Sequence, residues 1–169
     1  MNLIKTTLDG LVLLKPTIIK DNRGYFMESY HQKNIIKLIG NVSFVQDNES
    51  ESSRGVLRGL HFQKPPYSQS KLVRCVKGIV LDIALDLRKN SKTYGQFETI
   101  TLSEENKEQL FIPTGFAHGF IVLSEFAILS YKVDNYYNPE SESGIIWNDP
   151  DLNIDWKINK NEIIVSEKD

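Results

Sequence analysis

The stretch LRGLHFQKPPYSQSKLVR, residues 57–74, places three groups capable of chemistry close together in the chain. His61 titrates near neutral pH, so it can exchange a proton, and its neutral ring can also bind a metal. Arg58 precedes it and Lys71 follows it, and both side chains are positively charged. His61 is therefore a candidate base, a candidate metal ligand, or a residue that only packs.

Removal of a proton next to a carbonyl group sets clear requirements. The base needs a partner that orients it, a cation or donor for the developing enolate, and an acid that returns a proton. Lys71 and Arg58 are candidates for the enolate site, and Tyr131, Tyr136 and Tyr137 of SYKVDNYYNP are candidates for the acid. Each of them also has a structural interpretation, since tyrosines in β-proteins commonly pack with the hydroxyl bound to a partner or water.

The metal interpretation depends on further ligands. IPTGFAHGF, residues 112–120, resembles the second conserved motif of the cupin superfamily, whose metal-binding members add an earlier HxHxxxxE cluster that is absent here. A tight transition-metal site needs three or more convergent ligands. His61, His118 and Asp82 could supply them, but their spacing does not require it, and we expect no metal.

Strand geometry limits how Arg58 and His61 can act together. Side chains alternate along a strand, so these two residues point to opposite faces if the strand is regular. A glycine between them can hold a bulge that brings both to one face. We therefore predict a bulge or kink at Gly59.

Short β-rich runs separated by turn residues dominate the chain and predict an antiparallel sandwich or barrel of the jelly-roll kind. The runs include LVLLKPTIIKD, GYFMESY, VSFVQDN, GVLRGLHF, KLVRCVKG, GIVLDIALDLR, QFETITLS, EQLFIP, GFIVLS, FAILSYKVDNYY and GIIWNDP. Residues 32–40, QKNIIKLIG, are the best candidate for a helix, which Gly40 would end.

The run from Leu81 to Arg88 alternates apolar and polar side chains. The usual interpretation of an isolated strand of this kind is that Asp82 and Asp86 face solvent. The alternative is that the apolar face packs against a second sheet or subunit while the polar face lines a pocket.

The composition suits one soluble domain over residues 1–169, with a net charge of −2 that does not favour nucleic acid as a partner. The chain contains no apolar run of the roughly 18 residues needed to span a membrane, and its start lacks a signal-peptide core. Cys75 is the only cysteine, which fits a reducing cytoplasm, and we expect it to be buried rather than reactive.

Several ordered motifs together resemble the dTDP-4-dehydrorhamnose 3,5-epimerase family. The resemblance runs from about residue 3 to the last residue and is carried by DNRGYFMESY, FVQDNES, VLRGLHFQKPPYSQSKLVRCVKG, DLRKNSKTYGQF, LFIPTGFAHGF, YKVDNYYNPESESGIIWNDPDLNIDW and SEKD. It implies a cupin-like jelly roll that works without metal or organic cofactor. It also implies a homodimer whose partner helps to hold the nucleotide.

The implied reaction inverts C3 and C5 of dTDP-4-dehydro-6-deoxy-D-glucose, on either side of the C4 ketone, and leads to L-rhamnose and cell-surface polysaccharide. By resemblance, the base is His61 and its orienting carboxylate is Asp169. Lys71 stabilises the enolate, and Tyr131 is the acid on the opposite face of the sugar. The resemblance assigns the remaining site residues to substrate binding: Arg58 and His118 beside the enolate, Gln46 and Asn48 near the sugar and diphosphate, Arg23, Phe26 and Glu28 from the dimer partner, and Tyr137 in a stacking position.

Some alternatives remain open at the level of sequence. Because a chain end is prone to fraying, the α-carboxylate of Asp169 or the side chain of Asp82 could replace the Asp169 side chain beside His61. The motifs also fit an epimerase that inverts only C3 or only C5, or a ketoisomerase. From other classes, a metal-dependent cupin oxygenase and a non-catalytic sugar-binding module remain to be distinguished.

Overall fold

A computed structural model of the protein describes residues 1–169, and most of its regular structure is β-strand. The strands are β1 (Asn2–Lys5), β2 (Val12–Lys15), β3 (Ile18–Asp21), β4 (Gly24–Met27), β5 (Gln46–Ser53), β6 (Leu57–Gln63), β7 (Lys71–Lys77), β8 (Ile79–Asp86), β9 (Phe97–Ser103), β10 (Gln109–Ile112), β11 (Phe116–Val122), β12 (Phe126–Val133) and β13 (Glu142–Gly144). The helical elements are α1 (Gln32–Ile39) and the 3-10 turns η1 (Pro139–Ser141) and η2 (Lys160–Glu162). None of the helices is long and apolar enough to cross a membrane.

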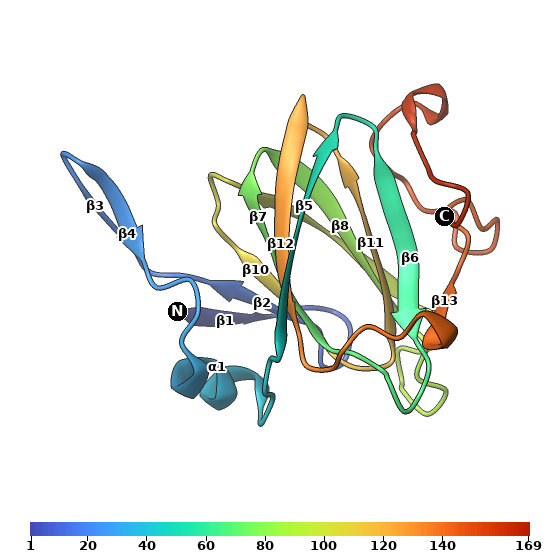
Figure 1. The fold of residues 1–169 in the computed structure, drawn as a ribbon, viewed down its shortest axis with the longest axis horizontal. Helices are drawn as coiled ribbons and strands as arrows, with labels where there is room; N and C mark the ends of the chain where they lie inside the picture. Colours follow the sequence, from blue (N-terminus) through green and yellow to red (C-terminus); the bar gives the residue numbers. More distant parts are fainter.

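Two antiparallel sheets face each other and form the body of the molecule (Figure 1). One sheet has six strands in the order β1-β2-β10-β7-β12-β5, and the other has five in the order β13-β6-β11-β8-β9. The β3–β4 hairpin forms a separate two-stranded sheet. The predicted all-β jelly-roll architecture with few short helices is confirmed.

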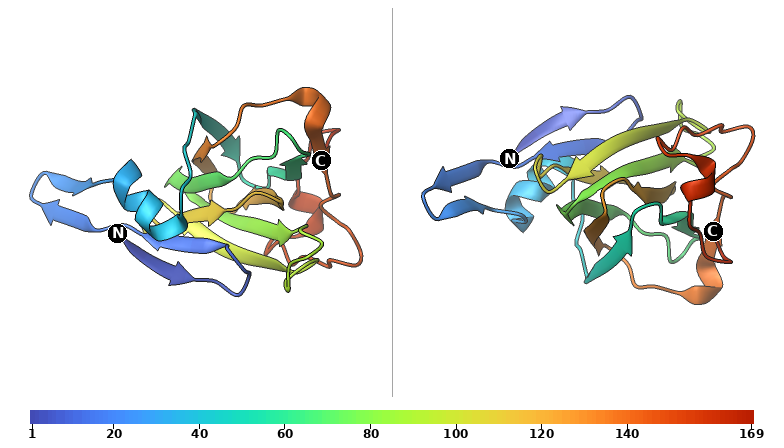
Figure 2. Two further views of the ribbon diagram at one scale, coloured as in Figure 1. Left: turned by 90° about the horizontal axis from the view of Figure 1, so that it is seen from below. Right: turned by 90° about the horizontal axis from the view of Figure 1, so that it is seen from above.

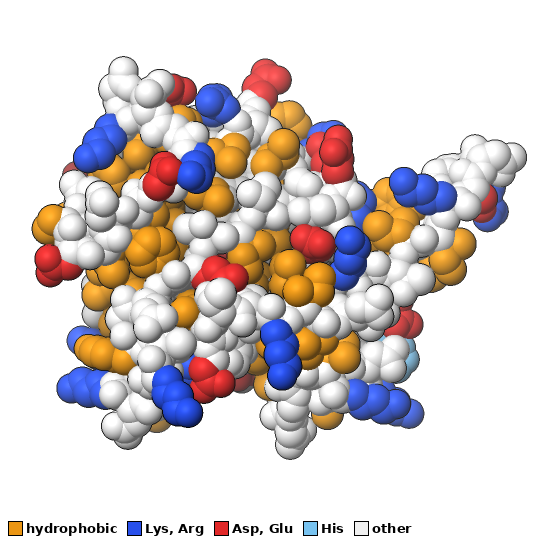
Figure 3. Space-filling view, turned by 180° about the vertical axis from the view of Figure 1, so that it is seen from behind, with side chains coloured by type: hydrophobic (Ala, Val, Ile, Leu, Met, Phe, Trp, Pro, Cys, Tyr) orange, Lys and Arg blue, Asp and Glu red, His pale blue; other side chains and the backbone are white.

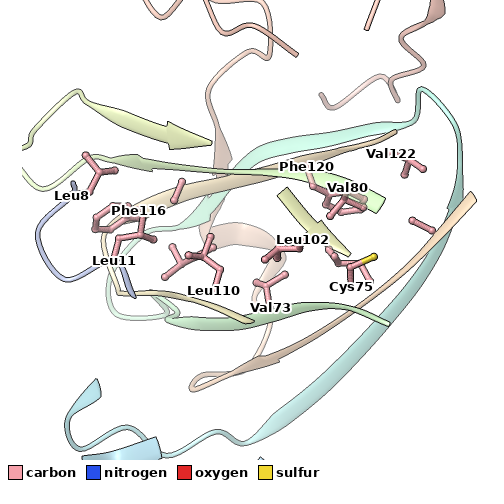
Figure 4. Close-up of a cluster of buried hydrophobic side chains, with 14 residues drawn as sticks. Leu8, Leu11, Val73, Cys75, Val80, Leu102, Leu110, Phe116, Phe120 and Val122 are labelled. Carbon is pink, nitrogen blue, oxygen red and sulfur yellow. The ribbon is translucent and has the colours of Figure 1, made fainter. Parts of the chain in front are cut away.

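The main hydrophobic core lies between the two sheets (Figure 4). The six-stranded sheet contributes Val73 and Leu110, and the five-stranded sheet contributes Val80 and Phe120. Each fully buried large apolar side chain stabilises the fold by about 1.5–3 kcal/mol. This layer fills one part of the space between the sheets, and the remaining part holds the candidate site.

Strand β8 is buried on both faces, so the expectation that its polar face meets solvent is wrong. Leu81, Ile83 and Leu85 lie in a second hydrophobic cluster, which is covered by Trp156 of the C-terminal segment, residues 148–169. Asp82 and Asp86 are both fully buried on the opposite side. A loop segment therefore covers the apolar face of β8. The alternative interpretation expected a second sheet or subunit there.

Helix α1 covers the outer face of the six-stranded sheet. Its one buried residue, Ile35, packs with Leu14, Leu72 and Phe111. Gly40 has φ of 90° and donates its N–H to Ile36 O at 3.0 Å, which ends the helix as predicted.

Three predicted strands have the wrong extent. GYFMESY forms a strand only as far as Met27, VSFVQDN becomes regular only from Gln46, and only Gly144 of GIIWNDP belongs to a strand. Ile145 and Trp147 instead pack as loop residues against the second cluster. Their apolar character reflects burial under the C-terminal segment and not strand pairing.

The β3–β4 hairpin, residues 18–27, projects from the body as an arm (Figures 1 and 2). Figure 3 shows hydrophobic and charged side chains side by side along it. Ile19, Tyr25 and Phe26 are 62%, 53% and 68% exposed. Lys107 contacts the arm from the body, with its ammonium group 4.4 Å from the centre of the Tyr25 ring. The arm thus presents apolar rings that the isolated chain leaves uncovered.

Candidate active site

A cavity of about 580 Å³ opens between the sheets. Its walls come from β5, β6, β7, β11, β12, β13 and the last residues of the chain. The structure brings nine of the predicted site residues together here: Gln46, Asn48, Arg58, His61, Lys71, His118, Tyr131, Tyr137 and Asp169. Residues from position 46 to position 169 therefore meet at one place.

His61 on β6 is the candidate base. Its Nε2 atom is buried 2.9 Å from Asp169 Oδ1, although the oxygen lies off the N–H direction, so this is a close electrostatic contact and not an aligned hydrogen bond. Its Nδ1 lies 4.0 Å from Glu142 Oε1. Because Nε2 is covered, Nδ1 is the nitrogen left to accept a proton from a ligand.

Opposing effects determine the charge of His61. Burial lowers the pKa of the imidazole and is the largest effect. The carboxylates of Asp169 and Glu142 raise the pKa, and the ammonium groups of Lys168 and Lys71 lower it. The net pKa lies below the usual value of 6.5. The ring is therefore neutral at pH 7 and able to act as a base.

The side chain of Asp169 is the partner of His61, and only 4% of it is exposed. Its Oδ1 accepts a hydrogen bond from Gly59 N at 3.0 Å, and its Oδ2 accepts from Ser166 N at 3.1 Å and Ser166 Oγ at 2.5 Å. Burial raises the pKa of Asp169, but these hydrogen bonds outweigh burial and hold it below the usual value. Asp82 is not the substitute partner, since it pairs with another histidine.

The predicted bulge at Gly59 is confirmed. His118 pairs with His61 and Phe120 pairs with Arg58, so two residues of β6 lie opposite the single residue Gly119 of β11. Gly59 has φ of +132°, and a Cβ atom there would lie 2.5 Å from Gly119 Cα. The bulge brings Arg58 and His61 to the same cavity.

Lys71, the first residue of β7, lines the cavity as an unpaired cation. Its ammonium group forms no hydrogen bond or ion pair within the chain. Burial lowers the pKa of its ammonium group to about 8, although Asp82 and Glu142 oppose this effect. Lys71 therefore remains charged at pH 7 and is free to meet an anionic oxygen.

Tyr131 on β12 lies in the six-stranded sheet, while His61 lies in the facing five-stranded sheet. Its hydroxyl forms no hydrogen bond within the chain, and burial raises its pKa, which Arg58 and Lys168 partly offset. A neutral hydroxyl on the wall opposite the imidazole can deliver a proton to the other face of a bound ring.

His118 on β11 is buried and directs Nε2 at Asp82, with distances of 3.1 and 3.0 Å to the two carboxylate oxygens. No group of three His, Cys, Asp or Glu side chains in the chain is close enough together to hold a metal ion. The donor set of His61, His118 and Asp82 considered from sequence is therefore not assembled.

Several cavity residues escaped sequence reasoning. Glu142 accepts hydrogen bonds from Tyr137 Oη at 2.9 Å and Lys168 Nζ at 3.1 Å, and so joins the cavity wall to the C-terminal segment. Ser166 holds Asp169. These residues lie within the SESG and SEKD stretches, but nothing in their local charge pattern separates them from solvated residues.

The cavity also contains polar side chains from the predicted substrate-binding set. Gln46 Nε2 donates to Asn48 Oδ1 at 2.7 Å, which fixes one amide against the other on β5. Arg58 Nε donates to Ser52 Oγ at 3.1 Å, so its position is also set.

Arg23, Phe26 and Glu28 lie on or beside the arm and not in the cavity of the same chain. Arg23 Nη2 pairs with Asp21 Oδ2 at 2.6 Å, and Glu28 Oε1 accepts from Asn34 Nδ2 at 3.1 Å. These residues can serve a cavity only if it belongs to a second copy of the chain.

Comparison with known proteins identifies related sequences and structures. The sequence model of the dTDP-4-dehydrorhamnose 3,5-epimerase family matches residues 5–169. The enzyme of that name from Methanothermobacter thermautotrophicus is 52% identical over 167 residues, which cover 98% of this chain and 90% of the relative. The dTDP-4-dehydrorhamnose 3,5-epimerase structure from Elizabethkingia anophelis is 54% identical with a TM-score of 0.96, covering 99% of this chain and 92% of that chain.

A second solved structure is the dTDP-6-deoxy-D-glucose-3,5-epimerase from Legionella pneumophila in complex with dTDP-4-keto-L-rhamnose. It is 48% identical with a TM-score of 0.94, covering 99% of this chain and 88% of that chain. The family match spans nearly the whole chain, and the fold agrees with that of the solved structures. The chain belongs to the dTDP-4-dehydrorhamnose 3,5-epimerase family and is an isomerase.

Proposed function

We propose that His61 is the base in the 3,5-epimerisation that defines this family, acting on dTDP-4-dehydro-6-deoxy-D-glucose to form dTDP-4-dehydro-L-rhamnose. The observation that carries the proposal is a neutral imidazole beside the Asp169 carboxylate, in one cavity with an unpaired ammonium group. The C4 ketone of the sugar acidifies the hydrogens on C3 and C5, so a placed base, an enolate cradle and an acid suffice for the reaction.

The proton moves between named groups. Nδ1 of His61 removes the hydrogen from the carbon next to the ketone, and the electron pair of that C–H bond forms an enolate. Asp169 stabilises the resulting imidazolium through Nε2. Lys71, with Arg58 and His118 nearby, stabilises the enolate oxygen.

Tyr131 then delivers a proton from the opposite wall, which inverts the carbon. One proton leaves and one returns at each carbon, so substrate and product are isomers. The phenolate left on Tyr131 regains its proton from solvent, and His61 returns its proton to solvent before the next inversion.

The arm supports a further proposal, that two copies of the chain form a homodimer and each arm contributes to the cavity of the other copy. The exposed rings of Tyr25 and Phe26 would be covered in such a dimer. Arg23 suits a diphosphate because a guanidinium group can bind phosphate oxygens through two parallel hydrogen bonds. Gln46, Asn48 and Tyr137 would contact the sugar and nucleotide from the cavity side.

Mixing two inactive variants tests the shared site. Arg23→Ala and His61→Asn lie on different parts of the chain, so a mixed dimer would contain one cavity with neither change. Activity that reappears on mixing, with a dimer mass by light scattering, is the expected result. A monomeric mass with full activity would contradict the proposal.

We also propose a cytoplasmic location. The only cysteine, Cys75, is buried, and burial raises the pKa of its thiol to about 11, so this thiol is unreactive as expected from the sequence. A chain without internal disulfides suits a reducing compartment.

Solvent deuterium exchange tests the reaction and the roles. The wild-type protein should incorporate deuterium at both C3 and C5, and exchange at one carbon alone would indicate a mono-epimerase. His61→Asn should lower exchange at both carbons at least about 10²–10⁴-fold, since that is the usual effect of one acid–base group. Tyr131→Phe should reduce inversion while retaining some exchange. His31→Asn, at a histidine outside the cavity, is the control.

Two other measurements test the alternatives. NMR of the product excludes or identifies a ketoisomerase, and elemental analysis tests for a bound metal.

A further inference from the structure

The C-terminal segment is attached to the strand that carries His61. Ile164 forms a parallel bridge with Val56, its N–H donates to Gly55 O at 2.8 Å, and its carbonyl accepts from Leu57 N at 2.8 Å. This attachment lies at the start of β6, a few residues before His61. The segment that bears Asp169 is therefore attached to the strand of the base and not to a separate part of the fold.

A closed turn beyond this attachment fixes the Asp169 carboxylate. Asp169 N donates to Ser166 O at 3.2 Å, and the Ser166 N–H and hydroxyl both donate to Oδ2, at 3.1 and 2.5 Å. With Oδ2 occupied by Ser166, Oδ1 is directed at Gly59 N and His61 Nε2. The two oxygens thus have separate tasks, one in the turn and one at the base.

We propose that Ser166 is a positioning residue of the epimerase, which holds the Asp169 carboxylate in the orientation that presents Oδ1 to His61. This inference rests on the proposed role of His61 as the base. The Ser166 hydroxyl makes the shorter of the two contacts to Oδ2. Without it, the backbone N–H of Ser166 alone retains Oδ2, and the carboxylate gains freedom to turn away from the imidazole.

The other charges around His61 do not depend on Ser166. Glu142 of β13 and Lys168 of the C-terminal segment pair with each other at 3.1 Å, and Lys71 faces His61 from β7. His118 lies opposite His61 on β11, and Arg58 lies before it on β6. None of these side chains hydrogen-bonds to Ser166, and Lys168, the one that belongs to its turn, is held by Glu142. A change in the titration of His61 on removal of the hydroxyl therefore reports on Asp169.

The test compares Ser166→Ala with Ser166→Thr, which keeps the hydroxyl. Ser166 is exposed, so the alanine variant opens no cavity. We expect Ser166→Ala to lower kcat roughly three- to tenfold, the range given by the loss of one ordinary hydrogen bond. Because Asp169 raises the pKa of His61, its displacement should move the acid limb of kcat/KM to lower pH. NMR titration of the His61 ring in the ligand-free protein should show the same direction.

Three further variants make the result decisive. Glu167→Gln changes a residue of the same turn that makes no side-chain hydrogen bond, and it should match the wild type. Asp169→Asn removes the group through which Ser166 acts, so adding Ser166→Ala to it should cause no further loss of activity. Ser166→Thr should retain the wild-type acid limb.

Unchanged kcat and an unchanged acid limb in Ser166→Ala would overturn the inference, as would an additional loss in the Asp169→Asn background. A lowered thermal midpoint with an unmoved His61 titration would show a purely structural role and would also overturn it. The proposed function fails separately, since it requires His61→Asn to be inactive whatever Ser166 does.

Discussion

Replacing Lys71 by methionine should inactivate the enzyme and at the same time stabilise its fold. Lys71 lies in the cavity without an ion-pair partner, and burial lowers its pKa from 10.5 to about 8. The folded protein therefore binds the proton of Lys71 less strongly than the unfolded chain does. Methionine has a similar length and carries no charge, so it fills the same space without this cost.

The magnitude follows from the two pKa values. A fall from 10.5 to about 8 corresponds to about 3.5 kcal/mol at about 1.4 kcal/mol per pKa unit. The side chain is partly exposed and the variant loses the attraction to Asp82, so we expect a net stabilisation of about 1–3 kcal/mol at pH 7. Loss of the cation at the enolate should lower the rate by roughly 10²-fold or more.

The pH dependence has a definite sign. Below pH 8 both folded and unfolded states carry the charged lysine, and the full cost is present. Above that pH the folded state loses its proton first, so the wild type recovers stability relative to the variant. The advantage of Lys71→Met should shrink by roughly half at about pH 9.5.

Urea denaturation at pH 7 and at the higher pH, at one protein concentration, measures both effects. Lys77→Met is the control, because Lys77 ends the same strand and is paired with Glu104 at 2.8 Å. It should not stabilise the protein. A Lys71→Met variant that is less stable than the wild type, or whose advantage does not change with pH, would refute this account.

Two further substitutions test features that position the site. Gly59→Ala should destabilise the fold by about 2 kcal/mol or more and abolish activity, because its Cβ would lie 2.5 Å from Gly119 Cα. Gly24→Ala is the control in the same urea measurement. Gly24 has φ of +131° and no atom near the added Cβ, so this variant measures the cost of backbone strain alone. Asp86→Asn should cost about 2–4 kcal/mol, because the buried carboxylate accepts hydrogen bonds from Arg88, Ser91 and Thr93. Burial alone would raise the pKa of Asp86, but these bonds hold it well below its usual range. The stability that the ionised carboxylate contributes is therefore present above about pH 4 and is lost only at strongly acid pH. The difference in stability between wild type and variant should persist across neutral pH. Equal stability of Asp86→Asn and the exposed-site control Asp151→Asn would contradict the second prediction.

Local features of the sequence were sufficient for much of the fold. Alternating runs predicted most of the strands, and the isoleucines before Gly40 predicted α1. The conflict between Arg58 and His61 predicted the bulge at Gly59, because strand alternation is a local rule that only an extra residue can break. The family resemblance supplied the roles, and nine of the residues it singled out line one cavity.

Tertiary structure alone decided which side of β8 faces inward. Alternation separates two faces but does not say what covers each one, and here the C-terminal segment covers the apolar face. Asp82 consequently lies inside and pairs with His118, although its pattern is that of a solvated residue.

The sequence by itself determined most of the strands and the helix, since these depend on neighbours in the chain, and through the family resemblance it singled out His61 as the candidate base. The surroundings of the base were decided by the folded chain, which brings Asp169, Glu142 and Lys168 beside His61 from distant positions. The charge and burial of a site depend on all groups that lie nearby in space, whereas a sequence pattern contains only the groups that lie nearby along the chain.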